Sequence, residues 1–227
     1  MASPFTDART SRELTDRLAH VRWIAGGTAA GKSTLARVLA ERHDAEVYSG
    51  DRAEHHWLTR CTPQRHPHLS AMRGMPPGGK WEGRTPQQVF QAMAGLHAET
   101  IGFVIEDLLT MSADHIILVD YFGILPAHIA PLLCWPGQAV FLLPTPEFRH
   151  NALRERYADL ARARANWGSS DPETMLAMRL ARDALWDQQV RSQAGSHALD
   201  LITVDGSTPS TDLASQLATR FELGGGA

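Results

Sequence analysis

The segment Gly26-Gly27-Thr28-Ala29-Ala30-Gly31-Lys32-Ser33 tells most about the architecture of this chain. An apolar run over residues 21–25 precedes it and predicts a buried strand. Leu35, Val38 and Leu39 follow it at helical spacing, so a helix is expected over residues 33–42. The sequence therefore predicts a strand, a glycine-rich turn and a helix in direct succession.

This segment matches the pattern G-x-x-x-x-G-K-[ST], which is typical of a phosphate-binding loop. Its glycines let the backbone turn tightly and direct successive N–H groups at a phosphate, and the helix that follows adds the positive end of its dipole. We expect Lys32 to reach the β- and γ-phosphates of a nucleotide and Ser33 to offer its hydroxyl to Mg²⁺. The residues expected to bind the nucleotide are Gly27, Thr28, Ala29, Ala30, Gly31, Lys32, Ser33 and Thr34.

Strand patterns alternate with helix patterns along the rest of the chain, and each connection is long enough for a parallel crossover. This alternation predicts a three-layer α/β fold with a five-stranded parallel sheet, whose third strand, the most hydrophobic, is expected to be central. The expected strands cover residues 21–25, 46–49, 115–120, 138–143 and 199–204. The expected helices cover residues 11–22, 33–42, 87–110, 127–133, 145–159, 171–194 and 212–221, with short helices in 52–84 and arginine-rich loop material from 160 to 170.

Composition limits the cellular setting and the partners of the protein. The chain has 227 residues and 24.9 kDa, which suits one domain. Its net charge of -3 gives no broad basic surface, so we expect neither nucleic acid nor membrane as a partner. Two cysteines suit a reducing compartment, and residues 1–7 resemble no secretory signal. The expected location is the cytoplasm.

Two acids follow predicted strands. Asp51 comes just after the second strand, and Asp120 ends the apolar run of the third, where an acid commonly holds Mg²⁺. Because ligands bind at the carboxyl ends of the strands in open α/β sheets, we expect Ser33, Asp51 and Asp120 to converge. An ordinary turn residue remains the alternative for each acid.

The run from Trp23 to Ser33 resembles that of P-loop small-molecule kinases, the group of nucleoside monophosphate, shikimate and gluconate kinases and chloramphenicol phosphotransferase. The base-reading N-K-x-D motif of GTPases is absent. The run, with the segments 119–126 and 142–149, is also similar to a widespread group of actinobacterial P-loop proteins known as ATPases.

The kinase resemblance implies one domain over residues 1–227, with an acceptor-binding segment at about 52–84 and a lid at about 149–171. It implies an enzyme that uses ATP and Mg²⁺ to phosphorylate a hydroxyl of a small molecule (a metabolite, nucleoside or antibiotic) and acts as a monomer or homodimer. Asp51 would orient the acceptor, and lid arginines would stabilise the transferring charge. The candidate catalytic residues are Lys32, Asp51, Arg154 and Arg156, with Arg182 a further candidate.

Several alternatives stay open at this stage. The chain could be a nucleotide-dependent ATPase switch that acts through a partner. The histidines between residues 55 and 68 fit no standard zinc spacing and favour a surface or a pocket lining. Trp57, Trp81 and Trp167 could stack on a substrate ring or pack in the core, and Lys80 could contact the acceptor or remain on the surface. The turn at 205–209 could lie against the base of the nucleotide.

Overall fold

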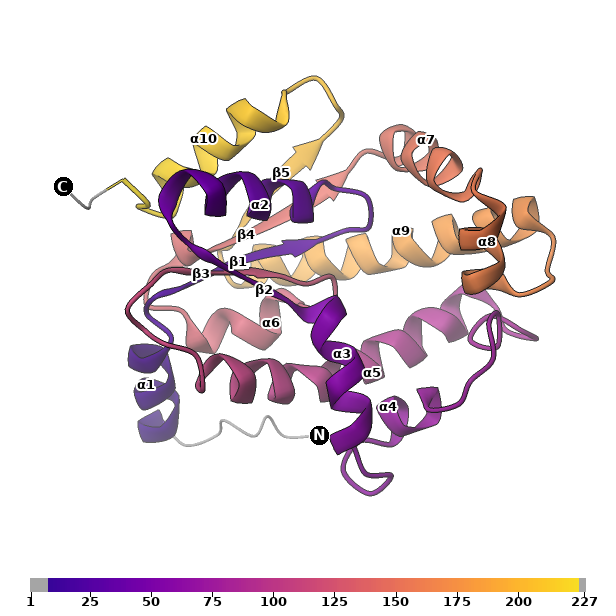
Figure 1. Cartoon of the computed structure of the whole chain (residues 1–227), viewed down its shortest axis with the longest axis horizontal. Coiled ribbons are helices and arrows are strands. Elements are labelled where there is room, and N and C mark those ends of the chain that lie inside the picture. The colour runs from indigo at the N-terminus through magenta and orange to yellow at the C-terminus, as the bar shows by residue number, and fades with distance from the viewer. Residues whose placement is uncertain (1–7, 225–227) are drawn as a thin grey trace.

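Five strands form one all-parallel sheet in the computed structural model, which describes residues 8–224 (Figure 1). The order across the sheet is β2-β3-β1-β4-β5. The sequence prediction of five parallel strands is thus confirmed, but the middle strand is β1 rather than the third strand. The strands are β1 (Val21–Gly26), β2 (Glu46–Ser49), β3 (Ile117–Asp120), β4 (Ala139–Pro144) and β5 (Asp200–Val204).

Burial of the strands explains this order. Every residue of β1 and β4 is buried, as expected for strands that helices cover on both faces. The first three residues of β3 are buried as well and its last, Asp120, is half-buried, whereas β2 at the edge exposes Glu46 and Val47. Hydrophobicity alone therefore marks a strand as interior without saying which interior strand is the middle one.

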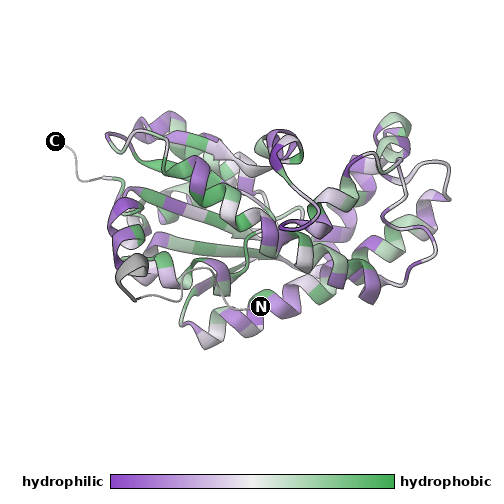
Figure 2. Ribbon diagram, turned by 90° about the horizontal axis from the view of Figure 1, so that it is seen from below, coloured by the Kyte–Doolittle hydropathy of each residue, from purple (hydrophilic) through white to green (hydrophobic). Residues whose placement is uncertain are grey.

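Helices cover both faces of the sheet (Figure 1). One face packs on α2 (Lys32–His43) and α10 (Ser210–Arg220) through a core that contains Leu35, Leu39 and Leu217. The other face carries a larger core beneath α1, α5, α6 and α9, and Figure 2 shows hydrophobic residues along the strands between the two helical layers. These four helices are α1 (Ala8–Arg17), α5 (Pro86–Leu108), α6 (Pro126–Ile129, followed by the 3₁₀ turn Ala130–Leu132) and α9 (Pro172–Ser196).

Four shorter helices lie toward or beyond the carboxyl edge of the sheet, where α5 and α9 extend past the strands (Figure 1). The helices are α3 (Gly50–Arg60), α4 (Pro67–Met72), α7 (Pro146–Tyr157) and α8 (Leu160–Trp167). A third core joins α7 and α8 to α5, α9 and the segment after α4. It includes Trp81, Tyr157 and Trp167, so the segment after α4 packs directly against the predicted lid.

One part of the secondary-structure prediction was wrong. Residues 160–167, expected as loop material, form the helix α8. Asp159 explains the helix, because its side chain accepts hydrogen bonds from the N–H groups of Ala161 and Arg162 and so caps the first turn. Alanine, leucine and arginine, which fill α8, are also strong helix formers. Within the described residues, no helix is long and apolar enough to span a membrane.

Candidate functional site

A cavity of about 520 Å³ opens at the carboxyl edge of the sheet. Its wall includes residues 28–34 of the loop and first turn between β1 and α2, together with Asp51 of α3 and Asp120 of β3. The expected convergence of Ser33, Asp51 and Asp120 on one site is therefore confirmed. The strand register explains it, because Ile24 of β1 and Ser49 of β2 both pair with Asp120. β2 and β3 therefore end at the same level, and β1 continues two residues further into the loop.

Glycines at two positions allow the loop to fold in this way. Gly26 has a φ of +115°, and a Cβ there would come 2.2 Å from the carbonyl oxygen of Leu142 on β4. Gly31 has a φ of +78° and begins α2 without a side-chain cap. The first N–H groups of α2 lack intrahelical partners, and Ser33 and Thr34 from that first turn line the cavity. The helix start therefore offers donors and a positive dipole to an anion.

Lys32 folds back over its own loop. Its buried ammonium donates a hydrogen bond of 2.7 Å to the carbonyl oxygen of Gly27. Burial lowers the pKa of Lys32, and the carboxylates of Asp120 and Asp51 oppose that effect. The ammonium thus has a neutral carbonyl oxygen as its hydrogen-bond partner and two carboxylates that act on its charge, and a phosphate oxygen could replace the carbonyl oxygen.

An ion pair supports the loop from the side of α7 and α9. Arg149 of α7 is buried and bonds Asp187 of α9 at 2.6 Å, and its Nε donates to the carbonyl oxygen of Thr28 at 3.3 Å. Gly27 lies close against this pair, since a Cβ there would come 2.5 Å from Nη2 of Arg149 and 2.8 Å from Oδ1 of Asp187. The pair therefore fixes the back of the loop.

Two carboxylates from α3 face the cavity. Asp51 and Glu54 are three residues apart, which places them on the same side of the helix. Asp51 is open to the cavity, yet the protein atoms crowded around it raise its pKa, with Lys32 acting in the opposite direction. Burial likewise raises the pKa of Glu54, and the charge of Asp51 adds to the rise. Both acids thus favour proton uptake more than a surface carboxylate does.

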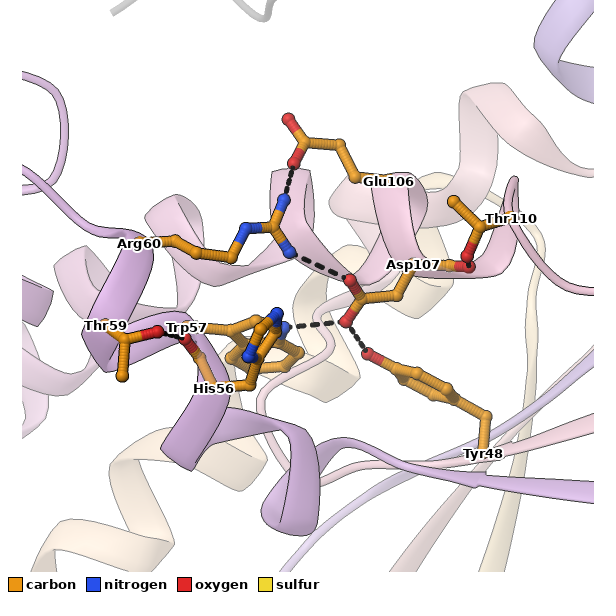
Figure 3. Close-up of polar contacts among 8 residues, drawn as sticks. All are labelled: Tyr48, His56, Trp57, Thr59, Arg60, Glu106, Asp107 and Thr110. Atoms are coloured by element: carbon orange, nitrogen blue, oxygen red, sulfur yellow. Dashed lines mark hydrogen bonds and ion pairs between the residues drawn. The ribbon is translucent and has the colours of Figure 1, made fainter.

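A hydrogen-bonded group around Asp107 of α5 holds α3 in place (Figure 3). One oxygen of Asp107 accepts from the hydroxyl of Tyr48 and from the indole N–H of Trp57, each at 2.8 Å, and the other accepts from Arg60 at 3.1 Å. Arg60 also pairs with Glu106 at 2.5 Å. Because Trp57 and Arg60 belong to α3, this group ties the helix that carries Asp51 to both β2 and α5.

The rest of the cavity wall combines apolar and basic side chains. Met72, Met75, Met93 and Leu96, from α4, the turn after it and α5, supply apolar surface. Lys80, Arg84, Arg179 and Arg182 supply positive charge, and Arg182 donates to the sulfur of Met93 at 2.6 Å, so the two sets are adjacent. Burial, followed by the charges of Arg179 and Arg182, lowers the pKa of Lys80 to about 8.

Of the predicted lid arginines, the structure brings one to the cavity. Arg156 lines it, whereas Arg154, two residues earlier on α7, is exposed and absent from its wall. Arg182, the further candidate on α9, also lines the cavity. Its guanidinium carbon lies 5.8 Å from the centre of the Phe122 ring, and the Lys32 ammonium lies 5.7 Å from the same centre.

The remaining candidate side chains divide between the hydrophobic cores, the cavity wall and the rest of the molecule. Trp57, Trp81 and Trp167 are all at least 98% buried in the hydrophobic cores and line no part of the cavity, so they do not form a stacking surface there. Lys80 points to the cavity. Of the histidines in the 55–68 segment only His68 lines it. Within residues 8–224, no three histidine, cysteine or acidic side chains gather as a metal-binding group.

Sequence reasoning missed Glu54 and Arg179. Glu54 had a usable signal, because it follows Asp51 at the three-residue spacing that places two helical side chains together. Arg179 had none, since its approach to Lys80 depends on how α9 packs against the segment after α4.

Comparisons with known proteins add little about activity. No protein-family model matches the chain, and no curated protein is similar to it in sequence. A solved structure described as a "putative kinase" from Chloroflexus aurantiacus is 14% identical, with a TM-score of 0.43 over 88% of this chain and 97% of that one. An uncharacterized protein from Eubacterium ventriosum is 11% identical, with a TM-score of 0.38 over 89% and 97%. Neither similarity is close enough to assign an activity.

Proposed function

We propose that this protein is a P-loop kinase that transfers the γ-phosphoryl group of ATP to a hydroxyl of a small molecule. One observation carries the proposal. Lys32 and Ser33 of the phosphate-loop motif share a cavity with two acids, Asp51 and Asp120, at the carboxyl edge of a parallel sheet. This combination supplies what phosphoryl transfer requires, namely donors for phosphate oxygens, oxygen ligands for a metal ion and a carboxylate for the acceptor.

The residues have distinct roles in this reaction. The loop N–H groups and Lys32 hold the phosphates, and Asp51 orients the acceptor hydroxyl. The acceptor oxygen forms a bond to the γ-phosphorus, the bond to the β–γ bridging oxygen breaks to leave ADP, and the hydroxyl proton passes to Asp51. Arg156, which lines the cavity, would bind equatorial oxygens in the transition state.

Ser33 and Asp120 fit a magnesium ion. Both offer oxygen atoms, the ligand type that Mg²⁺ prefers, and both line the cavity beside Lys32. Two protein ligands suffice, because Mg²⁺ in nucleotide sites keeps several waters and binds phosphate oxygens. When bound, the ion would offset phosphate charge.

The test uses mass spectrometry. The protein is incubated with Mg²⁺, ATP and a panel of hydroxyl compounds that includes nucleosides, hydroxy acids and antibiotics, with Lys32→Ala as the blank. We expect a product heavier by one phosphoryl group in the wild type alone. Asp51→Asn should retain ATP affinity and lose about 10²–10⁴-fold in transfer rate. The control Glu82→Gln changes an exposed acid in the turn before α5 that does not line the cavity, and it should keep full activity.

Two results would contradict the proposal. Release of ADP that is unchanged in Asp51→Asn, without any phosphorylated product, would favour an ATPase switch that acts through a partner. Absence of nucleotide binding in the wild type would remove the phosphate-binding role of the loop altogether.

A further inference from the structure

We propose that the acceptor has an apolar body and carries an anionic group, a carboxylate or a phosphate ester, which Lys80 and Arg179 bind. This inference rests on the proposed kinase function, since it assigns the nucleotide phosphates to Lys32 and the second set of cations to the acceptor. It narrows the acceptor from any hydroxyl compound to an amphipathic acid.

Lys80 and Lys32 lie beside different aromatic rings, Trp81 and Phe122, and Arg182 lies beside both rings. The acids and bases that act on Lys32 are Asp120, Asp51, Asp183 and Arg149. Those that act on Lys80 are Arg179, Arg182, Glu54 and Asp183, so the two lysines share only Asp183. The cavity therefore has two basic centres, one at Lys32 and one at Lys80. A nucleotide bound at Lys32 leaves the centre at Lys80 without a bound anion.

The second centre has more positive than negative charge. Lys80, Arg84, Arg179 and Arg182 supply four cations, against the two carboxylates of Glu54 and Asp183. Asp183 is already engaged, at 2.6 Å from Arg182 and 3.8 Å from Arg179. Across residues 8–224, no side chain or backbone group makes a hydrogen bond with the ammonium of Lys80; its one close partner is the Trp81 ring, 5.7 Å from the ring centre.

An anion would relieve this imbalance. Like charges at Lys80, Arg179 and Arg182 disfavour one another in a partly enclosed cavity, and this repulsion contributes to the lowered pKa of Lys80. A carboxylate or phosphate between them would form charge-assisted hydrogen bonds with the Lys80 ammonium and with the Nε groups of Arg179 and Arg182, which lack hydrogen-bond partners among the described residues. Two contacts hold the guanidinium of Arg179 in position, because it donates to the hydroxyl of Tyr157 at 2.5 Å and lies over the ring of that tyrosine.

The apolar residues beside these cations select the body of the acceptor, and Arg182 contacts one of them, Met93, at 2.6 Å. Met72, Met75, Val89, Met93 and Leu96 offer hydrocarbon and thioether surface to the cavity. A polyhydroxylated sugar would lose water from its hydroxyls against this wall without gaining partners. A ring or branched hydrocarbon would bury apolar surface there, and methionine side chains adapt to different shapes.

Glu54 links the two ends of this arrangement. It lines the cavity together with Asp51 and Lys80, and the charges of both act on its pKa, Asp51 raising it and Lys80 lowering it. The acceptor would therefore present its hydroxyl to Asp51 and its acidic group to Lys80, with the apolar body against α4 and α5.

The chain offers a direct test, because Lys32 and Lys80 are its only lysines. Lysine labelled with ¹³C at Cε gives two NMR signals, which Lys80→Arg assigns. The protein is first saturated with Mg²⁺ and the β,γ-methylene analogue of ATP, and then titrated separately with benzoate, phenyl phosphate, inorganic phosphate and benzyl alcohol. The nucleotide analogue should move the Lys32 signal, and benzoate or phenyl phosphate should then move the Lys80 signal and raise its pKa.

The four titrated compounds distinguish the possible outcomes. The tighter of benzoate and phenyl phosphate identifies the acidic group, and Lys80→Met should weaken its binding about tenfold or more while Lys80→Arg largely retains it. A Lys80 signal that neither anion moves, that benzyl alcohol moves equally, or that the nucleotide alone moves would overturn the anionic acceptor. Equal affinity for inorganic phosphate and phenyl phosphate would overturn the apolar body. A nucleotide that leaves Lys32 unmoved would instead refute the kinase function itself.

Discussion

Replacing Asp107 with alanine should destabilise the protein by about 2–5 kcal/mol, because Asp107 is the shared acceptor that holds α3. The indole N–H of Trp57 would lose its partner in a side chain that is 0% exposed, which costs about 1–3 kcal/mol. Tyr48 as a whole residue is 9% exposed, so loss of the hydrogen bond from its hydroxyl costs about 0.5–1.5 kcal/mol. The Arg60 pair is partly exposed and adds about 0–1 kcal/mol.

Urea unfolding followed by tryptophan fluorescence measures this loss. Glu106→Gln is the matched control, because Glu106 is the neighbouring residue, pairs with the same Arg60, and has a side chain that is 63% exposed. It should change the free energy of unfolding by at most about 1 kcal/mol. The two variants losing equal stability would refute the reasoning, since the buried indole N–H would then contribute nothing. Asp107→Ala should also lower the transfer rate, because α3 carries Asp51.

Two further predictions concern the loop and buried histidines. Gly27→Ala should weaken nucleotide binding and destabilise the fold by about 1–3 kcal/mol, because its Cβ would press on the Arg149 guanidinium at 2.5 Å. The control is Gly102→Ala within α5, where an added Cβ meets nothing within 4 Å and should stabilise the fold by about 0.5–1 kcal/mol. Calorimetry compares the stability of the two variants. Burial lowers the pKa of His97 to about 3 and that of His128 to about 4. Since an unfolded histidine titrates near about 6.5, their neutral forms favour the folded state fully above that pH, and the free energy of unfolding should fall as the pH drops from about 6.5 to 4. Urea unfolding at several pH values should show a shallower fall when both are replaced by glutamine; an unchanged slope would contradict the assignment.

The sequence predicted the parts of this molecule that depend on local pattern. Strand positions followed from apolar runs, and the approach of Asp51 and Asp120 to Ser33 followed from parallel strands ending together. The helix at residues 160–167 was missed although Asp159 caps it, because its arginines gave no apolar stripe to indicate a helix.

What could not be predicted depends on packing between distant segments. The basic centre around Lys80 requires α9 to bring Arg179 and Arg182 against a turn about one hundred residues earlier, and no local spacing encodes that approach. The same holds for Trp81 and Trp167, which pack together with Tyr157 in one core where α8 meets the turn before α5. The proposed acceptor site therefore depends on tertiary structure, whereas the phosphate-loop motif is contained in eight consecutive residues.

The single helix α9 connects the loop after β1 with the basic centre around Lys80. It is one uninterrupted helix of 25 residues that carries Asp187 behind the loop and Arg179 at the basic centre. Eight residues separate these two, about 12 Å along a helix axis, so a tilt of about 10° around Asp187 would displace Arg179 by about 2 Å. A shift of the loop that moved the Arg149–Asp187 pair in this way would also move Arg179, and so would couple the loop to the proposed acceptor site.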